Sequence, residues 1–112
     1  MEKKNEYRIH IVGNRVVASA LKRPGPKAHP LIRNHAQGWV MDYATPAPPE
    51  HQEYAVKGVE RCGFDFAALD VCDDGVRPYV LELNLAPGIL VWTAAQYARE
   101  FSRVWGRKLR AQ

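Results

Sequence analysis

The sequence lacks the features that mark membrane, secreted and zinc-ribbon proteins. No apolar run approaches the ~18 residues of a membrane-spanning helix, and the basic start, MEKKNEYRIH, has no apolar stretch behind it as in a signal peptide. The two cysteines, Cys62 and Cys72, are ten positions apart without a CxxC pair, which argues against a disulfide framework or a zinc ribbon. Internal repeats and low-complexity tracts are also missing. We therefore expect a reducing, cytoplasmic setting.

Acidic residues are modestly fewer than basic residues. The chain has 16 Lys and Arg against 12 Asp and Glu, a formal net charge of +4 and an isoelectric point near 9.3. This excess admits anionic partners such as nucleotide phosphates or nucleic acid. Hydrophobic residues make up 46% of the 112 residues, enough for a packed core, and the length allows at most one domain.

Alternating apolar and polar residues predict several strands. The two-residue turn signal Gly13-Asn14 separates strands expected at residues 7–12 and 15–21, which indicates a hairpin. Further strands are expected at 38–43, 64–72 and 79–85. The segment 22–35 contains three prolines and is expected to be a loop, either a solvated linker or a basic flap that orders on a phosphate.

Two helices complete the expected fold. The first starts at Pro49 or Glu50 and stops at Gly63, with an apolar stripe that contains Ala55, Val59 and Cys62. Thr93 is suited to cap the second. The order β-β-β-α-β-β-α predicts an α+β fold in which both helices cover one face of a mostly antiparallel sheet.

The stretch from Asp70 to Gly88, DVCDDGVRPYVLELNLAPG, contains the most informative pattern. If residues 73–78 form the connection, a register that pairs Cys72 with Val80 also pairs Asp70 with Glu82. Directly opposite Cβ atoms are roughly 4.5–5.5 Å apart, so the two carboxylates repel unless a cation lies between them.

Alternation places Asn84 on the face of Glu82, together with Val80. Two carboxylates and an amide oxygen suit Mg²⁺ or Mn²⁺ better than Zn²⁺. The alternative is a solvated sheet face, in which Arg or Lys side chains of a neighbouring strand balance the charge of the acids.

Four segments in order, EYRIHIVGNRVVA, IRNHAQGW, GFDFAALDV and VLELNLAPG, resemble the C-terminal catalytic half of ATP-grasp enzymes. The closest likeness is to the branch that includes the ribosomal-protein glutamate ligase and related bacterial and phage carboxylate–amine ligases. The resemblance implies that Asp70, Glu82 and Asn84 hold two Mg²⁺ or Mn²⁺ ions that bridge the phosphates of ATP. The γ-phosphoryl group would move to a substrate carboxylate, and an amine would then attack the acyl phosphate.

The same resemblance assigns roles to residues near the two ends of the first hairpin. Glu6 would take part in nucleotide binding, although a surface carboxylate is the alternative. Arg8 would act in catalysis by meeting phosphate or the substrate carboxylate, a task that suits its bidentate fork; alternatively it pairs with an acid across the sheet. Lys22 would contact phosphate, unless it is part of a solvated loop.

Three further residues and one histidine have weaker signals. By the resemblance, Arg33 and Asn34 would close on the ATP phosphates and the second metal ion, with Arg33 also catalytic. Leu81 would line the adenine pocket and, as a strand residue, lie in the core. His10 shares the face of Arg8 and either contacts substrate or is structural. Cys62 and Cys72 are expected to be buried.

Residues 1–112 would form a single ATP-grasp C-terminal subdomain without the N-terminal subdomain that forms the other wall of the ATP site. A missing half or a second copy of the chain would then be a partner. Two alternatives stay open: a catalytically inactive subunit of a split enzyme, and a small nucleic-acid-binding module that uses the 22–33 loop and the basic last helix.

Overall fold

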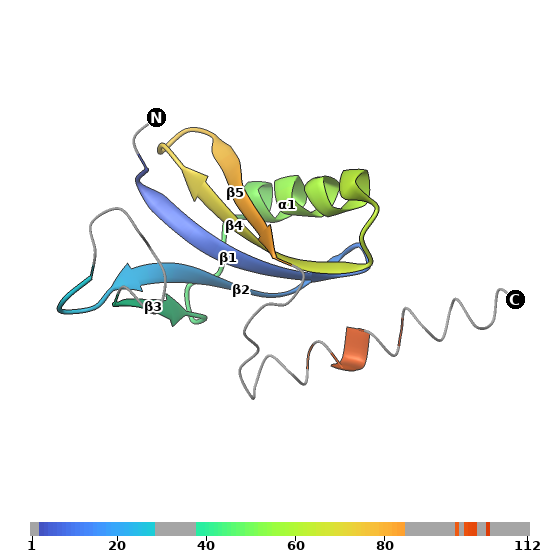
Figure 1. Ribbon diagram of the computed structural model, residues 1–112, viewed down its shortest axis with the longest axis horizontal. Coiled ribbons are helices and arrows are strands. Elements are labelled where there is room, and N and C mark those ends of the chain that lie inside the picture. Colours follow the sequence, from blue (N-terminus) through green and yellow to red (C-terminus); the bar gives the residue numbers. More distant parts are fainter. Residues whose placement is uncertain (1–2, 29–37, 85–95, 97, 101–102, 104–112) are drawn as a thin grey trace, which may run out of the picture.

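A five-stranded antiparallel sheet with one helix packed on it dominates the computed structural model, which describes residues 3–28, 38–84, 96, 98–100 and 103 (Figure 1). The strands pair in the order β3-β2-β1-β4-β5, so β1 is central and β3 and β5 are the edges. The bounds are β1 Asn5–Val12, β2 Arg15–Pro24, β3 Trp39–Asp42, α1 Pro49–Cys62, β4 Phe66–Asp73 and β5 Pro78–Asn84. No helix within the described ranges is long and apolar enough to cross a membrane.

The first hairpin forms where the turn signal predicts it. Val12 pairs with Arg15 across Gly13-Asn14, and Gly13 has a φ of 64°, a left-handed conformation that glycine adopts without a steric cost. The hairpin strands are therefore confirmed, and so are the three later ones, with bounds that differ by one or two residues except where β2 extends to Pro24.

Helix α1 begins at Pro49, and Gly63 directly follows its last residue and terminates it, as predicted. Gly63 has a φ of 75°, and its backbone N–H donates to the carbonyl of Glu60, so the chain reverses after the last helical turn. Ala55 and Val59 are fully buried against the sheet. The prediction for Cys62 was wrong: it is exposed, because it lies at the last position of the helix, beyond the edge of the buried stripe.

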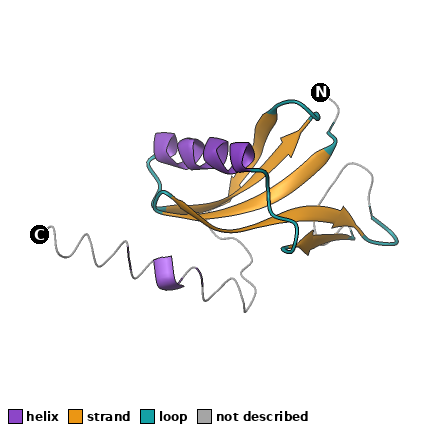
Figure 2. Cartoon of the chain, turned by 180° about the vertical axis from the view of Figure 1, so that it is seen from behind, coloured by secondary structure: helices purple, strands orange, loops and turns teal. Residues whose placement is uncertain are grey.

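The two faces of the sheet have different chemistry. On one face, Tyr7, Ile9 and Ile11 of β1 pack with Leu69 and Val71 of β4 and with α1 to form the core; Figure 2 shows α1 lying along this face. Because side chains alternate along a strand, the intervening residues point to the opposite face. We call that side the polar face; it carries Glu6, Arg8 and His10 of β1, Lys22 of β2 and Asp70 of β4.

The α+β class and the mostly antiparallel sheet are confirmed, and the order of the first six elements is as predicted. Residues 96, 98–100 and 103 are helical, in agreement with a second helix. The rest of that expected helix, from Thr93 onward, lies outside the described residues. Cys72 is buried, as predicted.

Candidate functional site

Asp70 and Glu82 lie directly opposite each other on β4 and β5. Ala68 pairs with Asn84 two positions along, so Asn84 extends from the same face as Glu82. The predicted pairing of the two carboxylates is therefore confirmed. Asp70 is nearly buried, whereas Glu82, on the edge strand, is exposed. The role of these three residues as metal ligands stays a prediction.

The register beyond this pair differs from the prediction. Cys72 pairs with Tyr79, not Val80, and Val80 pairs with Val71. A β-bulge restores the expected pairing at Asp70, because Leu81 is an extra residue between the two paired positions. Val80 is consequently on the other side, where it borders a hollow beside α1 with Tyr54 and Lys57.

The same bulge contradicts the expectation that Leu81 lies in the core. Leu81 is 45% exposed. An extra residue in the bulge has no partner across the ladder, and β5 has no strand on its outer side in the described sheet. The expected contact of Leu81 with adenine stays a prediction.

Arg8 binds Asp70 through two parallel hydrogen bonds. Its Nε donates to Oδ1 at 3.0 Å and its Nη2 donates to Oδ2 at 3.2 Å, because the two residues are direct neighbours on β1 and β4. Partial burial lowers the pKa of Arg8, but the hydrogen bond and charge of Asp70 outweigh it, and the pKa is raised. The structure thus shows the cross-strand ion pair that was the alternative for Arg8.

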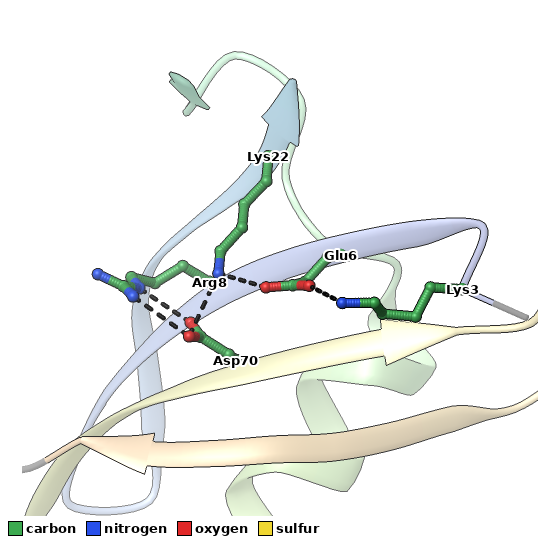
Figure 3. A network of polar contacts seen from close by, with 5 residues as sticks. All are labelled: Lys3, Glu6, Arg8, Lys22 and Asp70. Atoms are coloured by element: carbon green, nitrogen blue, oxygen red, sulfur yellow. Dashed lines mark hydrogen bonds and ion pairs between the residues drawn. The ribbon is translucent and has the colours of Figure 1, made fainter. Parts of the chain in front are cut away.

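Lys22 lies in β2, so its expected place in a loop was wrong: β2 continues through Pro24 because β3 pairs with it from Pro24 back to Leu21. The Lys22 side chain is only 1% exposed. Its ammonium donates to Oε2 of Glu6 and lies 3.2 Å from Oδ2 of Asp70 (Figure 3). Lys22 therefore joins the two carboxylates across three strands.

Glu6 is also buried, which rules out a surface carboxylate. It lies on the central strand rather than at an edge, and it accepts hydrogen bonds from Lys22 and, at 3.2 Å, from Lys3. Burial of a carboxylate is costly unless cations compensate it. We name the set Lys3, Glu6, Arg8, Lys22 and Asp70 the charge network.

Next to the charge network, His10 is fully buried and its Nε2 is 2.8 Å from the hydroxyl of Tyr43. Burial and the nearby charge of Arg8 lower the pKa of His10 to about 4, so the ring is neutral at pH 7. Sequence reasoning missed Tyr43 as the partner of His10 and Lys3 as a partner of Glu6. The His10–Tyr43 contact joins segments 33 positions apart, whereas Lys3 is only three positions before Glu6.

The donor set at Asp70 and Glu82 is compatible with a hard divalent cation. Within the described residues no three His, Cys, Asp or Glu side chains come together as a metal site, so a metal ion here needs the Asn84 amide and further oxygen ligands. Mg²⁺ commonly binds in this way, through one or two carboxylates and substrate phosphates. Arg33 and Asn34 lie outside the described residues.

Comparison with known proteins gives two sets of matches, while no family model matches the chain. The chain is 34% identical over 85 residues to the probable alpha-L-glutamate ligase 1 of Shewanella sp. (strain MR-4), and 36% identical over 84 residues to the ribosomal protein bS6–L-glutamate ligase of Salmonella paratyphi B. These matches cover 76% and 75% of the chain.

Solved structures share the fold. The ATP-grasp ligase PsnB, in complex with a minimal precursor, Mg and ADP, superposes with a TM-score of 0.60 at 12% identity, covering 89% of this chain and 34% of PsnB. The D-alanine–D-alanine ligase of Bacillus anthracis gives 0.61 at 20% identity, covering 99% and 42%. The chain therefore has the fold of these ATP-grasp ligases.

The chain spans about a quarter of the curated relatives it matches, 27% of the length of each ligase. The match is to the C-terminal part of the ATP-grasp fold, which confirms the resemblance drawn from the four sequence segments. None of the matches favours a nucleic-acid-binding module.

Proposed function

We propose that the chain is the metal- and nucleotide-binding module of an ATP-dependent carboxylate–amine ligase that acts through an acyl phosphate. The observation that carries the proposal is the pairing of Asp70 with Glu82 on neighbouring strands, with Asn84 on the same face and Arg8 beside them. The similarity to glutamate ligases, and to an ATP-grasp ligase bound to Mg and ADP, supports it.

In this proposal Asp70, Glu82 and Asn84 hold Mg²⁺, or Mn²⁺ as an alternative with similar oxygen preference. The bound metal ion would neutralise phosphate charge during phosphoryl transfer. The position of Glu82 suits this role, since its side chain is exposed on the edge strand β5. Asp70, by contrast, is already balanced by cations.

The remaining residues would bind and orient the reactants. Arg8 can present two parallel donors to a phosphate or to the substrate carboxylate. Glu6 and Lys22 would shape the nucleotide side of the site from within, since both are buried. Leu81 offers an exposed apolar surface for adenine, and Arg33 and Asn34 would contact phosphates.

The substrates in this proposal are ATP, a carboxylate and an amine, in a cytoplasmic setting. We also propose that residues 1–112 act as one C-terminal subdomain. The other wall of the nucleotide site would come from a further part of the same protein, a separate subunit or a second copy of the chain. The 27% share of the curated relatives supports this division.

Metal-dependent nucleotide binding tests the proposal. Isothermal titration of ADP in excess Mg²⁺ should show binding to the wild-type chain, with an affinity at least about tenfold lower in Glu82→Gln. The matched control is Glu53→Gln, an exposed glutamate on α1 on the opposite face, whose affinity should equal that of the wild type. Equal binding by Glu82→Gln and Glu53→Gln, or no binding by the wild type, would refute the proposed function.

A further inference from the structure

Both carboxylate oxygens of Asp70 are occupied by cations of the chain itself. Arg8 takes Oδ1 and Oδ2, at 3.0 and 3.2 Å, and Lys22 also approaches Oδ2, at 3.2 Å. A metal ion that uses Asp70 as a ligand must therefore compete with at least one of these cations. Either Arg8 or Lys22 must then leave Asp70.

The two cations are held very differently. The Lys22 side chain is 1% exposed and its ammonium lies between two carboxylates, Glu6 and Asp70. Arg8 is 18% exposed, and Asp70 is the only carboxylate with which it forms an ion pair in the described part of the chain. In Figure 3 the guanidinium of Arg8 approaches Asp70 from the side opposite to Glu6. Arg8 is thus the less enclosed of the two cations, and it loses fewer ion pairs than Lys22 if it leaves Asp70.

The charges around Asp70 are balanced without a metal ion. Three cations, Lys3, Arg8 and Lys22, face three carboxylates, those of Glu6, Asp70 and Glu82. A divalent ion alone would leave two excess positive charges in a partly buried site, where charge is poorly screened. A polyphosphate that enters with the ion supplies the missing negative charge and a new partner for a guanidinium.

From this geometry we infer that Arg8 is the exchangeable counter-ion of Asp70 and Lys22 the permanent one. When a metal ion and a polyphosphate enter together, the Arg8 guanidinium leaves Asp70 for a phosphate oxygen, while Lys22 stays between Glu6 and Asp70. The inference rests on the proposed function. It assigns Lys22 to positioning Asp70 rather than to phosphate contact, and it makes Arg8 the link between metal and phosphate affinity.

Linkage provides the test, because a coupling between two ligands has the same size in both directions. Mn²⁺ binding by the full chain is followed by electron paramagnetic resonance, and ADP binding by calorimetry with and without Mn²⁺. In Arg8→Gln, Asp70 loses its competing cation, so Mn²⁺ alone should bind at least about fivefold more tightly than to the wild type, near the lower limit of typical coupling. The factor by which Mn²⁺ tightens ADP binding should fall about tenfold.

Two further variants make the result specific. Arg61→Gln removes an exposed cation on α1, away from the polar face, and should match the wild type in both measurements. Arg8→Lys keeps the charge without the fork and should fall between the wild type and Arg8→Gln. It also serves if Arg8→Gln fails to fold.

The outcomes separate this inference from the proposed function. Suppose that the wild type binds both ligands, but Arg8→Gln binds Mn²⁺ alone less tightly or keeps the full coupling between Mn²⁺ and ADP. Arg8 then only orients Asp70, and the proposed exchange is refuted. If the wild type binds neither ligand, the proposed function is refuted, and the exchange that rests on it is refuted as well.

Discussion

At Lys22 the fold encloses a positive charge that a lysine ordinarily leaves in water. The ammonium is accommodated because two carboxylates, from Glu6 on β1 and Asp70 on β4, receive it. The desolvation of such ions is repaid only when every partner is in place. The charge network is therefore sensitive to the loss of any one member.

Replacement of Lys22 by Met tests this sensitivity. The variant keeps the volume of the side chain but leaves Glu6 and Asp70 without their shared cation, so the free energy of unfolding should fall by about 3–5 kcal/mol. Urea unfolding followed by circular dichroism measures it. The control is Arg23→Met, on the same strand as Lys22, which breaks an exposed ion pair with Asp42 of β3 and should change the stability little. A small effect for Lys22→Met would contradict its assigned burial between two acids.

His10 makes the stability depend on pH. Its pKa is about 4 in the folded chain and about 6.5 in an unfolded one, so between these values the unfolded chain binds more protons. The contribution of neutral His10 to the free energy of unfolding is therefore fully present above pH 6.5 and declines as the pH falls toward 4.

The expected loss from His10 alone is about 2 kcal/mol between pH 7.5 and pH 5. His10→Gln keeps a polar group near Nε2, which faces Tyr43, but does not titrate. Denaturant unfolding at both pH values should therefore show a smaller loss in His10→Gln than in the wild type. Parallel losses in the two proteins would mean that His10 is protonated in the folded state.

The sequence predicts the chemistry of single residues better than their surroundings. The pairing of Asp70 with Glu82 follows from strand alternation and a plausible turn, yet it is right only because the bulge at Leu81 cancels an error in the turn register. No composition signal marks that one-residue insertion. Lys22 was misplaced because Pro24 and Gly25 suggest a loop, whereas the pairing partner that extends β2 lies in β3.

At the level of elements, two glycines, one inside α1 and one directly after it, have opposite structural roles. Gly63 ends the helix with a φ of 75°, and a Cβ added there would meet nothing within 4 Å. Gly58 lies inside the helix, where an added Cβ would make ordinary contact with Leu69 at 3.6 Å. The first position needs glycine for its backbone, and the second does not.

Alanine at each glycine should therefore shift stability in opposite directions. Gly63→Ala forces a left-handed alanine and should destabilise the chain by about 1 kcal/mol. Gly58→Ala should stabilise it by about 0.5–1 kcal/mol through helix propensity. Thermal unfolding of the two single variants checks both signs, and a shift in the same direction would contradict the assigned end of α1.

The element order was predictable because turn and helix-end signals are local. Pro49 and Gly63 bound α1, and Gly13-Asn14 closes the first hairpin, each through the backbone preferences of the residue itself. Strand order is different, since it depends on contacts between distant segments. The placement of β4 beside β1, which brings Asp70 to Arg8, has no local signal.

For the whole molecule, that strand order creates the division between an apolar face under α1 and a polar face with the charge network. β1, β2 and β4 each contribute at least one side chain to the charge network, so the network exists only when these three strands are paired. A site assembled in this way is held by the sheet and not by a loop. The proposed ligands on β4 and β5 extend it toward the exposed edge of the sheet.

Paramagnetic broadening by Mn²⁺ in the presence of ADP tests most directly whether this edge is the metal site. In amide NMR spectra of the full chain, signals of residues 69–71 and 82–84 should broaden first, while those around Glu53 on α1 stay sharp. The Glu82→Gln variant should lose the effect at the same Mn²⁺ concentration. Broadening centred instead on the acidic turn at Asp73 and Asp74, or on α1, would contradict a metal site at Asp70 and Glu82.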